Sequence, residues 1–248
     1  MKDFILESCV DSVESALAAE RGGATRLELC ANLIIGGTTP SQWLYKEIRK
    51  QSPIRIHALI RPRFGDFCYT DYEFQIIREE VRMFGELGAE GVVIGILKPD
   101  GTLDVERMGL LMEDAKGMSV TLHRAFDVCV DPYRAMEQAK ELGINTILTS
   151  GQQDNCYKGK ELLRELVERE EGKITIQVGS GVDAQAIREL GPYTKAHDFH
   201  MSGKVTVSSA MTYRKEGVNM GMPSISEFEI WRTDENKIRE ARTVLENL

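Results

Sequence analysis

Charged and imidazole side chains follow apolar runs at several points along this chain, and together they could form one chemical site. The clearest example is Val120–Asp127, VTLHRAFD, where His123 and Arg124 stand side by side at the end of an apolar run. Buried strands rarely carry such a pair, because a buried charge is costly unless a partner or a ligand compensates it. The segment therefore indicates a strand that ends at a site.

A period-two pattern places polar side chains on one face of six predicted strands. In RLELCAN, Leu27 and Leu29 fall on the apolar face, whereas Glu28 and Cys30 fall on the other, since successive side chains of a strand point to opposite sides. The same rule places eight residues on the polar face, which are Glu7, Glu28, Cys30, His57, Arg61, His123, Gln177 and His200. Asp127 falls on this face as well when the period of two is counted onward from His123. We expect these groups to share one interior and to pair with one another or with a ligand.

Carboxylates beside imidazoles can act as general acids and bases. We therefore predict catalytic roles for a set of five residues, which are Glu28, His57, His123, Asp127 and His200. Three histidines with a carboxylate could instead bind a metal, although their sequence spacing matches no known metal motif.

Two further features predict the binding of an anion. Arginine binds carboxylates and phosphates through paired contacts, so we assign Arg61 and Arg124 to an anionic ligand, with Glu7 in the same site. The turn GSGV precedes a predicted helix start, and backbone N–H groups at such a position can hold a phosphate. The residues assigned to this turn are Gly179, Ser180 and Gly181.

Eight predicted strands alternate with helices along the chain. The strands are Ile5–Ser8, Arg26–Ala31, Ile54–Arg61, Gly91–Leu97, Ser119–Arg124, Thr146–Ser150, Ile174–Gly179 and His197–Met201. Eight such units in about 250 residues are typical of a (β/α)₈ barrel, or TIM barrel, whose strand carboxyl ends carry the active site. A doubly wound open sheet is the alternative.

The helices and the connections complete this prediction. The clearest amphipathic stretches are Tyr72–Leu87, Val105–Lys116, Pro132–Leu142 and Tyr157–Glu170. Residues 1–248 show no linker and no break in composition, so we predict a single domain. Ser202–Asp234 is long, rich in Gly, Ser and Met and weakly periodic, which predicts an extended loop after the last strand.

Composition excludes several classes of protein. The net charge is −8, which argues against nucleic acid as a partner. No apolar run approaches the roughly 20 residues that span a bilayer, so we expect no membrane partner, and the N-terminus is a poor signal peptide. Five scattered cysteines do not resemble a secreted disulfide framework, which favours the cytoplasm.

Several segments together resemble the CutC family, which is named for copper homeostasis. They are RLELCANLIIGGTTPS (26–41), IRPRFGDFCYTDYE (60–73), VTLHRAFDVC (120–129), ILTSGQ (147–152), GSGV (179–182) and MTYRKEGVNMG (211–221). The resemblance covers nearly the whole chain. The sequence departs from the family pattern at Phe64-Gly65, where two glycines are expected, and at His200-Met201-Ser202, where a His-Ser-Ser end is expected.

The resemblance implies a cytoplasmic TIM barrel, often a homo-oligomer, that handles copper by binding Cu(I). On the matching motifs, Cys30 and Cys68 are the first candidates for thiol contacts with Cu(I). The polar family motifs are matched by Glu28, Arg61, His123, Arg124 and Asp127. The resemblance brings no established reaction with it.

Two functions therefore stay open. One is a Cu(I)-binding protein of copper homeostasis, with thiolate ligands that suit this soft ion. The other is an enzyme that acts on a small anionic metabolite bearing a phosphate or a carboxylate, at the carboxyl-terminal mouth of the barrel. The second accounts for the arginines and carboxylates, which Cu(I) does not require.

Overall fold

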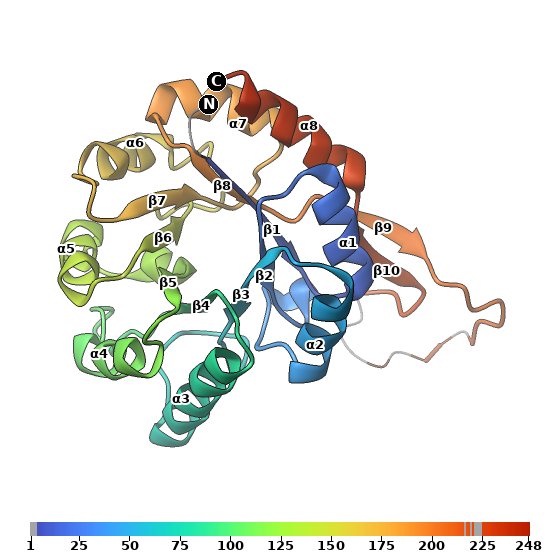
Figure 1. The fold of residues 1–248 in the computed structure, drawn as a ribbon, viewed down its shortest axis with the longest axis horizontal. Coiled ribbons are helices and arrows are strands. Elements are labelled where there is room, and N and C mark those ends of the chain that lie inside the picture. The colour runs from blue at the N-terminus through green and yellow to red at the C-terminus, as the bar shows by residue number, and fades with distance from the viewer. Residues whose placement is uncertain (1–3, 216, 219, 221–224) are drawn as a thin grey trace.

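A closed barrel of eight parallel strands forms the centre of the molecule (Figure 1). The computed structural model describes residues 4–215, 217–218, 220 and 225–248. The strands are β1 (Ile5–Val10), β2 (Arg26–Leu29), β3 (Arg55–Leu59), β4 (Gly91–Ile94), β5 (Ser119–Leu122), β6 (Thr146–Thr149), β7 (Thr175–Val178) and β8 (Asp198–Met201). Each strand pairs with the next, and β8 pairs with β1. The predicted TIM barrel is confirmed.

Eight α-helices surround the strands as an outer ring (Figure 1). They are α1 (Val13–Gly22), α2 (Gln42–Gln51), α3 (Asp71–Glu86), α4 (Val105–Asp114), α5 (Pro132–Leu142), α6 (Lys160–Glu168), α7 (Ala184–Thr194) and α8 (Glu235–Glu246). Local sequence sets their ends. For example, the Asp131 carboxylate accepts hydrogen bonds from the N–H groups of Tyr133 and Arg134, and Pro132 occupies the first turn of α5, where a proline loses no helical hydrogen bond.

The apolar face of each strand packs against the helices, as the period-two pattern predicts. Leu27, Leu29, Ile56 and Leu122 are fully buried in this layer. Burying a Leu or Ile side chain contributes roughly 1.5–3 kcal/mol relative to exposing it. The layer between strands and helices is therefore the main core, and it fixes the direction of the polar side chains inside the barrel.

Most strands end earlier than predicted at the mouth of the barrel. β2 ends at Leu29, β3 at Leu59 and β5 at Leu122, because the chain turns into loops there. Asn32, for example, adopts a left-handed conformation with φ 54°, which an extended strand cannot contain. Consequently Cys30, Arg61 and His123 follow the last strand residues and lie at the rim.

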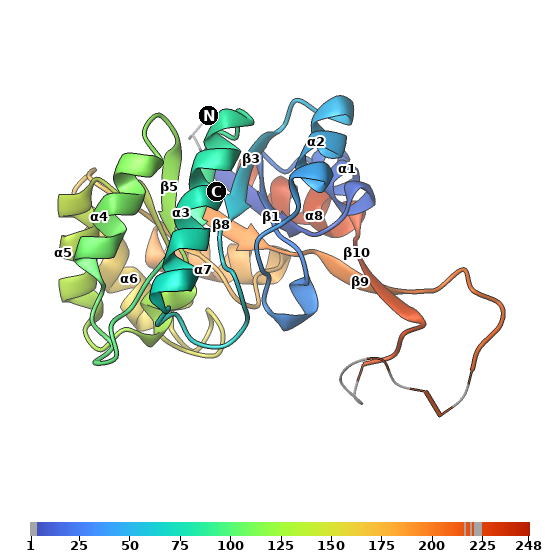
Figure 2. The ribbon, with the colours of Figure 1, turned by 90° about the horizontal axis from the view of Figure 1, so that it is seen from below.

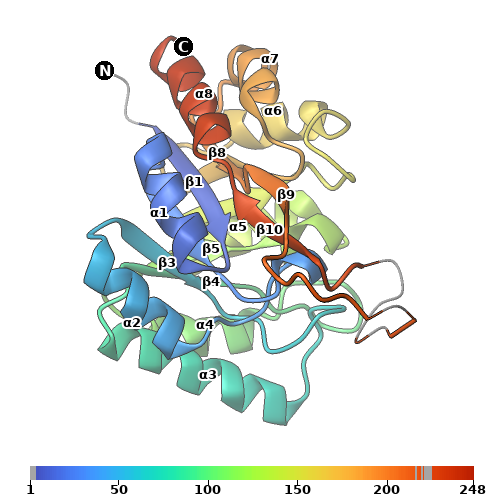
Figure 3. The same ribbon diagram turned by 90° about the vertical axis from the view of Figure 1, so that its right-hand side faces the viewer.

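The segment predicted as an extended loop contains two strands. β9 (Lys204–Ser208) and β10 (Glu229–Thr233) form an antiparallel pair, with Ile230 opposite Val207. Apolar and polar residues alternate over only five positions in β9, KVTVS, and do not alternate in β10, EIWRT, so neither strand stands out in this Gly- and Ser-rich segment. Figures 2 and 3 show this strand pair outside the barrel. No helix among the described residues has the length and apolarity to cross a membrane.

Candidate functional site

A cavity of about 490 Å³ opens at the carboxyl-terminal mouth of the barrel. Eight residues predicted for the site line it, which are Glu28, Cys30, Arg61, His123, Arg124, Ser180, Gly181 and His200. Five predicted residues are not among its lining, which are Glu7, His57, Cys68, Asp127 and Gly179. Five of the eight lining residues, which are Glu28, Cys30, Arg61, His123 and His200, are those that strand parity predicts for the interior.

Beside the cavity, a buried network connects β1, β2, β7 and β8. The Nε of Arg26 donates to Glu7 Oε2 at 2.5 Å, and its Nη2 donates to Gln177 Oε1 at 3.3 Å. The Gln177 amide in turn donates to Glu7 Oε1 at 3.2 Å, and His200 Nδ1 lies 2.8 Å from the same oxygen. Glu7 is fully buried, so its charge depends on these partners.

The ionisation of this network follows from its charges. Burial opposes ionisation of Glu7, but Arg26 and His200 hold the pKa of the carboxyl well below its usual range. Burial alone would lower the pKa of His200, yet nearby Cys9, Glu28 and Glu7 raise it well above the ordinary value. We conclude that Glu7 is a carboxylate and His200 an imidazolium, which form an ion pair. Glu7 is thus not a free ligand group.

Glu28 lies between this network and the cavity. Its Oε2 is 3.6 Å from His200 Nδ1 and makes no hydrogen bond with a described residue. Burial raises the pKa of Glu28 to about 7. One donor atom each of Glu7, Glu28 and His200 lies within 4.8 Å of the others. This set of donors is rich in oxygen and therefore suits harder ions than Cu(I). In addition, the Glu7 carboxylate already accepts a hydrogen bond from Arg26.

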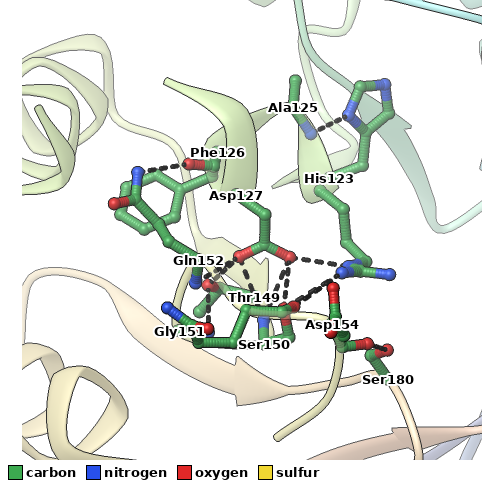
Figure 4. Close-up of polar contacts among 12 residues, drawn as sticks. His123, Ala125, Phe126, Asp127, Thr149, Ser150, Gly151, Gln152, Asp154 and Ser180 are labelled. Atoms are coloured by element: carbon green, nitrogen blue, oxygen red, sulfur yellow. Dashed lines mark hydrogen bonds and ion pairs between the residues drawn. The ribbon is translucent and has the colours of Figure 1, made fainter. Parts of the chain in front are cut away.

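His123 holds one fixed tautomer above the end of β5. Its Nδ1 accepts a hydrogen bond from the Ala125 N–H at 3.1 Å (Figure 4). Burial and the Arg61 charge lower the pKa of His123 to about 3, so the ring is neutral and its proton is on Nε2. Nε2 has no partner among the described residues. A Cβ at Gly95 would lie 2.6 Å from this ring, so the glycine makes room for it.

Arg61 holds the loops around the mouth through their carbonyl groups. Its Nη1 donates to Gly37 O at 2.9 Å and Gly36 O at 3.3 Å, and its Nη2 donates to Gly65 O at 2.9 Å. Its Nε has no partner among the described residues. The guanidinium carbon lies 5.1 Å from the centre of the Phe67 ring. The positive charge therefore meets carbonyl dipoles, and no carboxylate among the described residues pairs with it.

Asp127 follows β5 in the loop above the strand, so strand parity does not decide where its side chain points. The strand ends at Leu122, and Arg124–Val128 form a 3₁₀ helix, η2, in which strand parity no longer applies. Figure 4 shows the Asp127 carboxylate accepting hydrogen bonds from Thr149 Oγ1 and from the N–H groups of Ser150 and Gln152. It joins η2 to the loop after β6.

Arg124 leaves the strand and reaches the rim of the cavity. Its Nε donates to Asp127 Oδ2 at 2.6 Å, and its Nη2 donates to Ser150 Oγ at 3.0 Å. The side chain is 42% exposed, so water screens its charge. Arg124 is thus both an ion-pair partner of Asp127 and a cation at the mouth.

His57 lies inside the barrel but outside the cavity. It is on β3, and a Cβ at Gly91 of neighbouring β4 would lie 2.6 Å from its ring. Burial, with a further contribution from Arg26, lowers the pKa of His57 to about 4. Its Nδ1 has no partner among the described residues. The parity prediction is confirmed, and the predicted contact with a ligand is not supported.

The turn after β7 has the backbone expected of an anion-binding turn only in part. Ser180 and Gly181 line the cavity with left-handed φ angles of 68° and 77°. The Ser180 hydroxyl, however, donates to Asp154 O at 2.7 Å (Figure 4). Gly179 serves packing, because a Cβ there would lie 2.6 Å from Leu148 Cδ1.

Two cysteines line the cavity, and only one of them was predicted to bind a ligand. Cys30 does so, and its neighbour is Cys9 rather than Cys68. β1 continues to Val10, so Cys9 lies within the strand and points to the same side as Glu7. The predicted strand ended at Ser8 and therefore did not include Cys9. Burial raises the pKa of the Cys30 thiol well above its usual value. Met201 also lines the cavity, but its side chain is part of the core between the strands and the helices.

Comparisons with known proteins agree with the resemblance in sequence. The CutC family model matches residues 4–205. A family protein CutC from Parabacteroides distasonis is 48% identical over 95% of this chain and 98% of its own. The human copper homeostasis protein cutC homolog is 39% identical over 99% of this chain and 90% of its own.

Solved structures show the same relationship. A CutC structure from Streptococcus agalactiae has a TM-score of 0.77 and 30% identity, and the match covers 81% of this chain and 99% of that one. A thiamine phosphate pyrophosphorylase from Pyrococcus furiosus, with a TM-score of 0.57 and 16% identity, shares the barrel fold alone. On the family model and the identity to these relatives, the chain belongs to the CutC family.

Proposed function

We propose that this protein takes part in copper homeostasis, the role named for its human relative, by binding Cu(I) through Cys9 and Cys30. One observation carries the proposal: the two thiols, from neighbouring strands, line the same cavity. Cys9 is 7% exposed and Cys30 is 1% exposed. The pair is therefore shielded from bulk solvent but next to an opening through which an ion can enter.

The donors available at this point suit Cu(I). Thiolate and thioether sulfur are soft ligands that select Cu(I) over harder ions. His200 is excluded from the set because it is an imidazolium in the ion pair with Glu7, and a protonated ring has no lone pair to offer. The proposed ligands are therefore Cys9 and Cys30.

A titration of the reduced protein with Cu(I) against a competing chelator tests this proposal. We expect one ion per chain, and loss of binding in the Cys9→Ser, Cys30→Ser double variant. The matched control is Cys68→Ser, since Cys68 is outside the cavity lining, and it should bind as the unchanged protein does. Undiminished affinity in the double variant would disprove the proposal.

We also propose a cytoplasmic location. The proposed ligands act only as reduced thiols, and the cytoplasm keeps thiols reduced. All five cysteines are free in the structure, as this function requires. Fractionation of the source cells, with antibody detection of the chain, tests the location.

A second candidate is an enzyme that acts on a small anionic metabolite. Glu28 Oε2 and His123 Nε2 are buried without a partner among the described residues, and both side chains line the cavity with Arg61. Unpartnered buried polar atoms are costly, and functional sites are where such a cost is retained. Glu28 would accept a proton, and His123 would donate a hydrogen bond to the reacting oxygen.

Thermal-shift measurements against small phosphates and carboxylates test this second candidate. Anything that binds only the folded chain raises the melting temperature. We expect stabilisation by at least one of these anions and its loss in Arg61→Ala. If no anion stabilises the protein, or if Arg61→Ala changes nothing, the enzyme hypothesis fails.

A further inference from the structure

Two unpartnered hydrogen-bond donors belong to side chains that both contact one aromatic ring at the mouth of the barrel. They are Arg61 Nε and His123 Nε2. The guanidinium carbon of Arg61 is 5.1 Å from the centre of the Phe67 ring, and the centre of the His123 ring is 4.7 Å from it. All three side chains line the cavity. They form a cluster, here called the Arg–Phe–His subsite, that contains two donors and no acid.

The free part of Arg61 matches a carboxylate. The carbonyl groups of the surrounding loops accept the hydrogen bonds that Nη1 donates, and Gly65 O accepts one hydrogen bond from Nη2. Nε–H has no partner among the described residues, and beside it Gly65 O is the one described acceptor for the two hydrogens of Nη2. Two parallel N–H groups on one edge are the geometry that binds both oxygens of a carboxylate. The carbonyl groups that hold the rest of the guanidinium also fix this edge in place.

His123 restricts which kind of ligand atom can contact it. Its Nδ1 is committed to the Ala125 N–H, so Nε2 carries the proton and can only donate. The Phe67 ring and Gly95 confine the imidazole from two sides. A ligand atom here must therefore be an acceptor. A carbonyl oxygen fits better than a hydroxyl, since a carbonyl has no proton of its own to place in a buried site.

We propose that the Arg–Phe–His subsite binds a small 2-oxo acid. Arg61 holds the carboxylate, His123 donates to the neighbouring carbonyl oxygen, and the planar ligand lies against Phe67. This inference rests on the second candidate function and names its ligand class. The cavity of about 490 Å³ is in the range of small-molecule sites. A tetrahedral phosphate would use the same cation but would not lie flat on the ring.

Calorimetric titration of the full-length, copper-free protein with pyruvate tests the subsite. Propionate is the matched ligand, because it has the same carboxylate and no oxygen on the second carbon. Losing one buried hydrogen bond weakens binding roughly tenfold. We therefore expect propionate to bind at least about tenfold more weakly than pyruvate, and inorganic phosphate more weakly than pyruvate.

Two variants locate the contacts. His123→Phe retains a ring against Phe67 but has no N–H, so it should bind pyruvate and propionate equally. Arg61→Lys retains the positive charge but lacks the two parallel N–H groups of the guanidinium. It should therefore weaken the binding of pyruvate and of propionate by the same factor. Melting temperatures show whether each variant is folded. If His123→Phe does not fold, His123→Gln, whose amide N–H replaces Nε2–H, should keep the preference for pyruvate.

Three results would overturn the subsite. They are equal binding of pyruvate and propionate by the unchanged protein, no heat of binding with pyruvate, and phosphate binding tighter than pyruvate. Failure of the enzyme hypothesis looks different: pyruvate would bind with the expected dependence on Arg61 and His123, yet no small 2-oxo acid would be consumed.

Discussion

The two halves of the barrel interior differ in how their polar groups are paired. Around β7, β8, β1 and β2, the network of Glu7, Arg26, Gln177 and His200 satisfies both carboxylate oxygens of Glu7 and places each positive charge beside this carboxylate. We call this the paired sector. Around β3, β4 and β5, the unpaired sector, His57 Nδ1, Arg61 Nε and His123 Nε2 have no partner among the described residues.

This difference separates structural groups from groups available to a ligand. In the paired sector the charges of Glu7, Arg26 and His200 compensate one another, whereas Glu28 Oε2 on β2 has no partner among the described residues. In the unpaired sector, Gly91 at the start of β4 and Gly95 directly after its end leave room for the imidazoles of His57 and His123. These imidazoles stay neutral because burial lowers their pKa values. The unpaired sector supplies donors to the cavity and is sensitive to acid.

Breaking the paired sector should have the largest effect. Glu7→Gln keeps the shape of the side chain but removes the carboxylate charge that Arg26 and His200 contact. Removing one partner of a buried ion pair typically costs about 3–5 kcal/mol, so we expect a loss of that size in the free energy of unfolding, measured with urea. The control is Glu246→Gln, an exposed partner of Arg242, which should cost less than about 1 kcal/mol. Similar losses in both variants would refute the distinction between the sectors.

Acid should destabilise the unpaired sector through His57. The folded chain holds this ring neutral, with a pKa of about 4, whereas an exposed histidine titrates near about 6.5. The unfolded chain therefore binds a proton that the folded chain does not. This contribution to stability is complete above about pH 6.5 and falls by roughly 3 kcal/mol as the pH approaches about 4.

The measurement is the free energy of unfolding against pH for the unchanged protein and for His57→Gln. Glutamine does not titrate, so the difference between the two curves isolates His57 from the other groups. We expect the variant to lose less stability between neutral pH and pH about 4. Parallel curves over this range would show that His57 is not held neutral.

Filling the space beside His123 should have a smaller effect on stability. In Gly95→Ala the new Cβ would lie 2.6 Å from the imidazole, which forces the ring or the backbone to move. Overpacking of this kind typically costs about 1–3 kcal/mol, and the preference for pyruvate over propionate should fall. Gly109→Ala, in helix α4 with no neighbour closer than 3.8 Å to the added carbon, is the control and should not destabilise. An unchanged ligand preference in Gly95→Ala would count against the assigned position of His123.

The alternation of strands and helices predicted the barrel, and the alternation of residues within strands predicted five polar residues of the cavity lining, which are Glu28, Cys30, Arg61, His123 and His200. Leu27 and Leu29 face the helices, whereas Glu28 and Cys30 face the cavity, because the pleat of a strand fixes this alternation. The rule does not extend beyond the strand ends. Asp127 lies in the 3₁₀ helix η2, and Cys9 was missed because β1 is two residues longer than predicted.

Contacts between distant segments could not be predicted from the sequence. Nothing local indicates that Arg26 will pair with Glu7 and so compensate it, or that the amide of Ala125 will fix the tautomer of His123. Phe67 contacts both Arg61 and His123 only because loops close over the mouth. Periodicity identifies the face of a strand, but the pairing of groups on that face depends on the closed barrel.

The most direct test of the copper-binding proposal is X-ray absorption at the copper edge of the Cu(I)-loaded protein. We predict a first shell made of sulfur, with its intensity lost in the Cys9→Ser, Cys30→Ser variant and retained in Cys68→Ser. A first shell of nitrogen and oxygen, or a spectrum that the double variant leaves unchanged, would contradict the assignment of Cu(I) to the two thiols of the cavity.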